Sequence, residues 1–288
     1  MRKNKEKGWI ALLSLCLPAF MLASEALSLN TEVVREDIAQ AHKAQSNEEL
    51  AKELANPVAN LISLPMQLNY DRGFANTSGS DSNRWTLNVQ PVIPISLNDE
   101  WSVISRTIVP LIRTDNYPLG SGVTYGVGDV VQSLFFSPKE PTQSGWIWGV
   151  GPVFLVPSGS DVSAETWGAG PTAVALKQDG PWTYGGLANH IWSLDGDIDI
   201  STTFVQPFLT YTTPDALSIS VMTETTYNWE ASEDNEWSVP LFLMMTQVDK
   251  IGSQTISYGG GVKYYAKSPE GGAEGWGLRF VFTMLFPK

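Results

Sequence analysis

The last strand-like stretch of the chain constrains the fold more than any other feature. From Trp276 to Phe286 every second residue is large and apolar, whereas the residues between them are mixed and include Arg279 and Thr283. An alternation of period two is typical of a β-strand with two different faces. The apolar face ends in an aromatic residue almost at the chain terminus. The pattern therefore predicts an all-β protein, a closed transmembrane antiparallel β-barrel.

The N-terminus has the organisation of a secretory signal peptide. A basic run from Arg2 to Lys7 precedes an apolar stretch from Trp9 to Leu22, and small residues near Ala26 permit cleavage. The apolar stretch is about 14 residues long, short of the roughly 20 that a membrane-spanning helix needs. We therefore expect residues 1–26 to be removed on the way to the outer membrane of a Gram-negative bacterium.

The composition excludes several classes of function. The formal net charge is −12, so the chain offers no basic surface for nucleic acid. Cys16, the single cysteine, lies within the expected signal peptide, and the mature chain would hold neither a disulfide nor a thiolate metal site. We expect no cofactor. Charged residues make up 17 % of the chain, against roughly 25 % in soluble domains, which indicates that lipid covers part of the surface.

Residues 27–60 are predicted to be helical rather than extended. Ser46 and Glu49 form a capping-box pattern, in which each side chain satisfies the other residue's backbone N–H. Apolar residues then recur at helical spacing from Leu50 to Leu61, and Pro57 is expected to break or bend the helix. The segment either plugs or gates the barrel or is a periplasmic lead-in to the first strand. The sequence does not decide between these two interpretations.

Residues 61–288 are predicted to form the barrel itself. Segments of strand-like pattern, each closed by a turn signal, follow one another and predict about twelve strands. These segments are Leu61 to Tyr70, Arg84 to Leu97, Trp101 to Ile112, Tyr125 to Phe136, Gly145 to Val156, Thr166 to Lys177, Pro181 to Ser193, Thr202 to Tyr211, Leu217 to Asn228, Trp237 to Gln247, Gln254 to Ala266 and Trp276 to Phe286.

The connections between these segments alternate between two kinds. Mostly tight ones, such as Asn98 to Glu100 and Gln178 to Gly180, alternate with longer polar ones, such as Asp71 to Asn83 and Trp229 to Glu236. Outer-membrane barrels have this asymmetry, with the short turns on the periplasmic side. An even number of strands also puts both termini on that side.

Tryptophans gather at the predicted strand ends. Indole joins a large apolar ring system to one N–H donor, so it is stable at the boundary between hydrocarbon and headgroups. We therefore assign a membrane-interface girdle to Trp85, Trp101, Trp146, Trp167, Trp182, Trp192, Trp229, Trp237 and Trp276.

The polar face of the same strands predicts what lines the lumen. Because a charge that faces mid-bilayer lipid costs about 2 to 4 kcal/mol, charged residues inside strands should point inward. We assign the lumen and a substrate path to Gln67, Asn69, Asn88, Gln90, His190, Glu224, Lys263 and Arg279. Prolines inside several strands, among them Pro91, Pro152 and Pro240, indicate bulges, bends or gaps, which the sequence does not distinguish.

Signals for catalysis and metal binding are weak. A lipid hydrolase would need a histidine beside a serine at the lipid-facing rim, but His190 and Ser193 are three residues apart and fall on opposite faces of one strand. We therefore expect no enzyme. Asp195, Asp197 and Asp199 alternate in a long connection and are weak candidates for Ca²⁺; a solvated acidic loop is the more economical interpretation.

Four runs of sequence resemble a family of bacterial outer-membrane proteins filed under the meta-cleavage pathway of phenol degradation and labelled as transporters. The most specific run is Leu50 to Asp71; Gln90 to Pro94, Tyr125 to Asp129 and Leu187 to Ser193 are similar as well. The resemblance covers about residues 48–288. It implies a monomeric or loosely associated barrel that carries hydrophobic compounds, in the manner of fatty-acid and aromatic uptake channels.

Together these features predict an outer-membrane channel for passive passage of small hydrophobic or aromatic molecules. The alternatives are a closed structural or receptor barrel without transport and, less favoured, a lipid hydrolase. The expected partners are outer-membrane lipid and lipopolysaccharide, the barrel-assembly machinery through the C-terminal strand, and the small hydrophobic solute.

Overall fold

The structure is a computed structural model that describes residues 45–74, 82–117, 122–195 and 198–287. The chain divides into two units at Gln45, and the second unit, Ser46–Lys288, contains all the elements described below. The predicted signal peptide and the first part of the predicted helical segment lie outside the described residues. Among the described residues, no helix is both long and apolar enough to cross a membrane.

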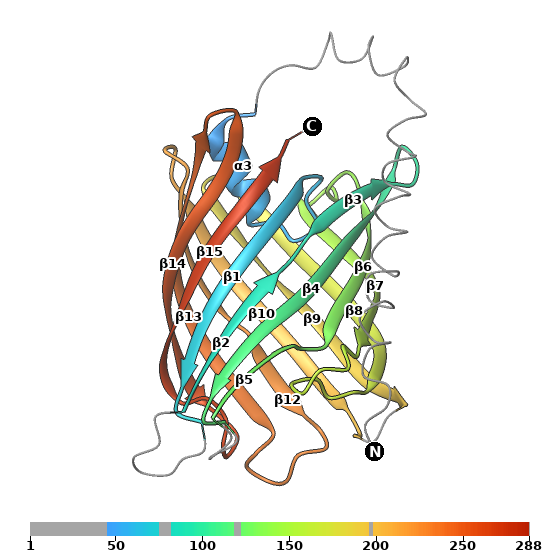
Figure 1. Ribbon diagram of the computed structural model, residues 1–288. Coiled ribbons are helices and arrows are strands. Elements are labelled where there is room, and N and C mark those ends of the chain that lie inside the picture. The colour runs from blue at the N-terminus through green and yellow to red at the C-terminus, as the bar shows by residue number, and fades with distance from the viewer. Residues whose placement is uncertain (1–44, 75–81, 118–121, 196–197, 288) are drawn as a thin grey trace. The chain divides into compact units, whose positions relative to one another are not determined.

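One short helix precedes a series of strands (Figure 1). The elements are α3 (Asn47–Leu54), β1 (Ile62–Arg72), β2 (Asn83–Val89), β3 (Val92–Ser96), β4 (Trp101–Asp115), β5 (Val123–Val127), β6 (Val130–Pro138), β7 (Trp146–Val156), β8 (Trp167–Asp179), β9 (Trp182–Asp195), β10 (Ser201–Thr212), β11 (Leu217–Thr223), β12 (Thr225–Asn228), β13 (Trp237–Ile251), β14 (Gln254–Lys267) and β15 (Gly275–Phe286).

The strands form a closed antiparallel barrel. Each wall strand pairs with its neighbours in sequence, and the last strand, β15, pairs with the first, β1, with Leu68 opposite Phe280. Three wall strands are each divided into two segments: β2 with β3, β5 with β6, and β11 with β12. The fifteen segments therefore make twelve wall strands, as the sequence predicted.

Prolines account for several irregularities of the wall. Pro91 lies in the break between β2 and β3, and a register shift lies beside Pro240 in β13. In β7 and β8, Pro152 and Pro171 are directly opposite each other. Neither has an N–H to donate, so the ladder is weakened at this point. The ladders that flank this pair, β6 with β7 and β8 with β9, also lack pairings near these two prolines.

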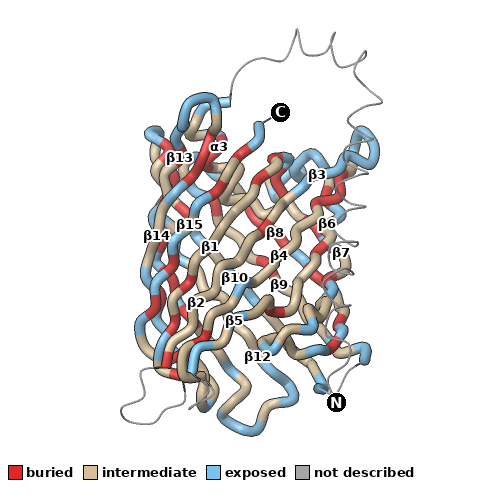
Figure 2. Tube along the Cα trace, in the orientation of Figure 1, coloured by how far each residue is buried: buried red, intermediate tan, exposed pale blue. Residues whose placement is uncertain are grey.

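The two faces of each strand differ as the alternation predicted. In β15, Leu278, Phe280 and Phe282 are exposed on the outside, whereas Arg279 and Thr283 are buried inside. Buried and more exposed residues consequently alternate along the strands (Figure 2). Tryptophans lie on the outside near the strand ends, and paired rings such as Tyr70 with Trp85 and Trp101 with Trp148 continue the two bands.

The short and long connections lie at opposite ends of the barrel. Figure 1 shows α3, the C-terminus and the tight turns at one end, and the longer connections at the other. The connection between β7 and β8 folds inward: Ser160 Oγ donates to the carbonyl oxygen of Val127 at 2.6 Å, and Ala164 N donates to Asp129 Oδ2 at 2.9 Å. Gly126 makes room for it, because a Cβ there would lie 2.5 Å from a Val162 methyl carbon.

Candidate functional site

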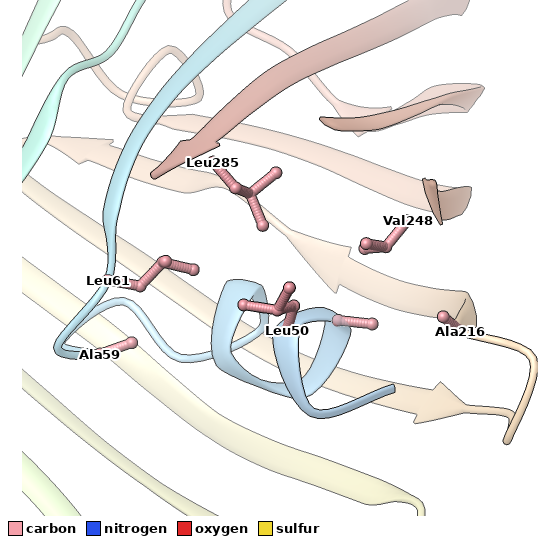
Figure 3. Packing of buried hydrophobic residues seen from close by; sticks show 7 residues of the cluster. Leu50, Ala59, Leu61, Ala216, Val248 and Leu285 are labelled. Atoms are coloured by element: carbon pink, nitrogen blue, oxygen red, sulfur yellow. The ribbon is translucent and has the colours of Figure 1, made fainter. Parts of the chain in front are cut away.

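The helix α3 lies against the inner wall at the short-turn end of the barrel. It begins with the predicted capping box, in which Ser46 N donates to Glu49 Oε2 at 2.9 Å and Glu49 N donates to Ser46 Oγ at 3.2 Å. Leu50 and Ala51 are buried in a cluster with residues from the barrel wall (Figure 3). The wall and segment residues of this cluster are Ala59, Leu61, Ala216, Val248 and Leu285.

The chain between α3 and β1 continues into the lumen. Val58 is buried in a second apolar cluster with wall residues of β4, β6, β8 and β9, and Gln178 Nε2 donates to the backbone oxygen of Lys52 at 2.8 Å. The helix itself ends at Leu54, three residues before Pro57. Residues 46–61, called the inner segment below, therefore occupy the lumen at this end rather than leading straight into β1 from outside.

A network of charged side chains crosses the lumen beyond the inner segment. Arg279 on β15 donates from Nη1 and Nη2 to the two carboxylate oxygens of Glu224, at 2.6 and 2.8 Å, and from Nε to Asn69 Oδ1 at 2.7 Å. Glu224 lies between β11 and β12, so this bidentate pair joins two parts of the wall that are not neighbours. Bidentate arginine–carboxylate pairs are among the strongest polar contacts in proteins.

A second ion pair extends the network toward the long-loop end. Lys263 Nζ lies 2.6 Å from Asp71 Oδ1, and Tyr265 donates its hydroxyl to the same oxygen at 3.0 Å. Both charged side chains are almost fully buried. Further along, the Arg84 guanidinium stacks on the ring of Phe74, 4.7 Å from its centroid. These contacts line this stretch of the lumen with charged side chains.

Between the inner segment and this network lies a cavity of about 250 Å³. Part of its lining is polar, including Gln67, Gln90, Arg106 and Gln206. The remainder is apolar, with Phe208 and two methionines among the residues that project into it from β10, β11 and β13. It is thus a small amphipathic chamber inside the barrel, with the inner segment as one boundary.

The structure places most of the predicted lumenal residues on the inner face. Those with inward-facing side chains are Gln67, Asn69, Asn88, Gln90, Glu224, Lys263 and Arg279. Gln67, Gln90 and Arg279 also line the cavity. Sequence reasoning did not select Arg106, Asp71 and Tyr265 as site residues. The sequence did contain a signal for them: each is a polar residue at a strand position whose side chain points into the barrel.

His190 was assigned to the lumen, and this prediction is wrong. On β9 the inward residues are Thr183, Leu187 and Ile191, so His190 has the opposite parity and faces outward. Its ring lies 4.1 Å from that of Trp192, centroid to centroid. Residues two positions apart on a strand face the same side. Trp192, two residues after His190, was assigned to the outer girdle, so the sequence contained a signal that His190 faces outward.

On the outer face, His190 contacts two hydroxyl groups. Its Nδ1 lies 2.7 Å from Thr203 Oγ1, and its Nε2 lies 3.5 Å from Ser201 Oγ. Trp229 Nε1 also donates to Thr203 Oγ1, at 2.9 Å. Ser193, the nearest serine in sequence, lies on the opposite face of the strand, as predicted. The histidine–serine contact across β9 and β10 was not visible in the sequence because it depends on strand register.

The predicted girdle tryptophans lie outside the barrel, and several are about half exposed. Metal ligands do not converge in the part of the chain that the structure describes: no group of three or more histidine, cysteine, aspartate or glutamate residues comes together there. Asp197, one of the weak calcium candidates, lies outside the described residues.

No protein-family model matches the chain, and no curated protein matches its sequence. Among solved structures, it is similar to an outer membrane channel from Pseudomonas putida F1, with a TM-score of 0.60 and 14 % identity, covering 79 % of this chain and 96 % of that chain. The fold is that of an outer-membrane β-barrel. Its outward apolar face, bounded by tryptophans at both ends, fits a bilayer, and the protein is therefore located in the outer membrane.

Two further structures are similar at lower scores. The β domain of the Bordetella autotransporter BrkA has a TM-score of 0.45 and 10 % identity, covering 79 % of this chain and 100 % of that chain. Outer membrane phospholipase A from Escherichia coli has a TM-score of 0.44 and 10 % identity, covering 84 % of this chain and 99 % of that chain. At these identities the likeness concerns the fold alone.

Proposed function

We propose that this barrel passes small hydrophobic or aromatic molecules across the outer membrane passively. The observation that carries the proposal is the lumenal cavity of about 250 Å³, which is lined by the barrel wall, including Arg279 of the charged network, and by the inner segment. Small-molecule pockets usually measure about 300 to 1,000 Å³ and are largely apolar, so this chamber suits a solute of one or two rings. The resemblance to the phenol meta-cleavage family supports an aromatic substrate.

The inner segment acts in this proposal as a plug that must move for solute to pass. Its buried apolar side chains against the wall are Leu50, Ala51, Val58, Ala59 and Leu61, none larger than leucine. A segment with so few apolar contacts opens at a lower cost than a strand of the barrel. The plug therefore admits one solute at a time without leaving a permanent water-filled pore.

The wall beside the cavity supports a sideways route as well. Gln90 lines the cavity, and Pro91 next to it lies in the break between β2 and β3, where its oxygen accepts from Thr107 N at 3.1 Å. On the outer face at this point, Thr107 Oγ1 donates to Gln132 Oε1 at 2.5 Å. Polar side chains facing lipid in mid-strand are uncommon in barrels, and here they mark an amphipathic patch beside an interrupted ladder.

Uptake of radiolabelled naphthalene by cells with an intact lipopolysaccharide outer membrane tests the proposal. Cells that produce the protein should take up naphthalene faster than cells with an empty vector. Ser220→Trp fills the cavity and should abolish the gain, whereas Ser253→Trp, in an exposed turn, should retain it. Equal uptake with and without the protein would reject passive transport and leave a closed structural or receptor barrel.

The contact between His190 and Ser201 favours a lipid hydrolase as the second candidate. Nε2 of His190 faces the serine hydroxyl on the lipid side, the arrangement that such an enzyme needs. However, Nδ1 is held by the neutral hydroxyl of Thr203, so no carboxylate would stabilise an imidazolium. The test is hydrolysis of a 4-nitrophenyl ester by the unaltered protein and by Ser201→Ala. Activity that the substitution abolishes would establish this function, and equal activity of the two proteins would exclude it.

A further inference from the structure

Arg106 differs in its partners from Arg279 and Lys263, two other cations of the lumen. Its Nη2 donates to Gln90 Oε1 at 3.0 Å, and among the described residues this is the one hydrogen bond of its side chain. Arg279 and Lys263, in contrast, each have a carboxylate at 2.6 Å. A guanidinium has five N–H donors, so most of those of Arg106 remain available. Because Arg106 lines the cavity, these donors face the space that a solute would occupy.

The two cations that line the cavity, Arg106 and Arg279, differ in their partners. Arg279 forms an ion pair with Glu224, whereas the described residues show no ion pair for Arg106. Taking an unpaired charge out of water is costly, so such a cation in a lumen indicates an anionic partner.

Glu53 of α3 is the one acidic side chain among the residues that line the cavity. It lies beyond ion-pair distance of Arg106, since the described residues show no such pair within 4.0 Å. Glu224 already accepts both N–H groups of Arg279. Among the described residues, therefore, no carboxylate directly neutralises Arg106.

Apolar side chains also line the cavity. Phe208, Met222 and Met244 lie on β10, β11 and β13 among polar residues such as Ser220 and Thr246, and Val281 lies on β15. Methionine is flexible and polarisable and adapts to irregular apolar ligands. A molecule that fills the cavity would hence contact apolar side chains over its body and a guanidinium at one end.

We propose that the cavity binds small apolar carboxylates, with Arg106 as the counter-ion of the carboxylate group; the inference rests on the proposed passage of small molecules and names their class. The planar guanidinium matches a carboxylate in a bidentate manner. Gln90 orients the guanidinium from the side. The cavity volume restricts the body to one or two rings or a short chain.

Isothermal titration calorimetry on the full mature protein in lipid nanodiscs tests this assignment. The probes are benzoate, benzyl alcohol and benzylammonium, which share a ring and differ in charge. Benzoate should bind about tenfold or more tightly than the other two, the scale expected for a charge-assisted hydrogen bond. Arg106→Gln should remove this preference, and Arg106→Lys should retain part of it, because lysine keeps the charge without the planar fork.

Arg113→Gln is the matched control. Arg113 lies on the same strand, faces outward, pairs with Asp115 at 3.0 Å and does not line the cavity. This variant should bind benzoate as the unaltered protein does. Electrophoretic mobility of unheated samples shows whether each variant is folded. Equal affinity for the three probes, or a benzoate preference that survives Arg106→Gln, would overturn the proposal.

The two proposals fail in different ways. Naphthalene uptake together with equal binding of the three probes would leave passive transport standing and reject the carboxylate site. Arg106-dependent binding of benzoate without naphthalene uptake would leave the site standing and reject transport of neutral aromatics.

Discussion

Replacing Leu50 by alanine should loosen the inner segment from the barrel wall. Leu50 is 1 % exposed and lies at the centre of the cluster that holds α3 in place (Figure 3). Truncating a buried leucine costs about 2 to 5 kcal/mol. We expect about 3 kcal/mol, since this cluster lies at the end of the barrel, where water can enter the space that is left.

The cost should appear in the docking equilibrium of the helix rather than in the stability of the barrel. Leu50 contributes no backbone hydrogen bond to the wall ladder, which closes independently of it through β1 and β15. At about 1.4 kcal/mol per factor of ten, a loss of 3 kcal/mol raises the undocked population about a hundredfold. The folded barrel should otherwise be retained.

The absence of cysteine from the sequence after Cys16 provides a direct assay. In the variant Ala51→Cys the thiol replaces a side chain that is 3 % exposed, so it reacts with a maleimide mainly when the helix leaves the wall. Adding Leu50→Ala should accelerate labelling in lipid bilayers about a hundredfold. Leu50→Met conserves volume and should accelerate it less than about tenfold, because such exchanges cost under about 1.5 kcal/mol.

A cysteine at Asp99, in an exposed short turn, controls for access of the reagent. Its labelling rate should be the same with and without Leu50→Ala. An unchanged rate for Ala51→Cys in the Leu50→Ala background would refute the reasoning, because the leucine would then not hold the segment in the lumen.

Three further predictions concern the network, the helix cap and the outer face. Glu224→Gln leaves Arg279 without its carboxylate and should cost about 3 kcal/mol, the lower end of the range for a broken buried pair because the Glu224 side chain is 24 % exposed. Denaturant unfolding measures this, and adding Arg279→Gln should recover part of the loss; additive costs would contradict the pairing. Ser46→Ala removes the helix cap, costs about 1 kcal/mol and should speed labelling of Ala51→Cys about fivefold. Phe280→Arg puts a charge toward lipid and should destabilise the barrel by about 2 to 4 kcal/mol, also by denaturant unfolding; a cost near zero would mean that this face is not in the bilayer.

The sequence predicted the barrel because its signals are local. Alternation along a strand such as β15 depends on residues two positions apart, and each turn signal depends on a few neighbours. Interior charges follow from the cost of placing a charge in lipid, which is why Glu224, Lys263 and Arg279 were assigned inward. The capping box at Ser46 and Glu49 is equally local, and it forms as predicted.

The orientation of His190 was not fixed by its own neighbours. Asn189 on one side is polar and Ile191 on the other is apolar, so the alternation is ambiguous at this point. In a strand the side-chain period is two, and a shift of one residue moves every side chain to the other face. The pairing with β10 sets His190 opposite Thr203, and the two side chains are in contact on the outer face.

What the sequence determined by itself is the architecture: a twelve-stranded wall, its two faces, its tryptophan girdles and the helix start at Ser46. What only the tertiary structure decided is how distant parts meet in the lumen. Residues far apart in the chain meet there: Leu50 and Leu285 share one buried cluster, Glu224 pairs with Arg279, and Arg106 bonds Gln90. Such contacts depend on closure of the barrel, which brings β1 beside β15, and no local pattern encodes the side chains that then face each other across it.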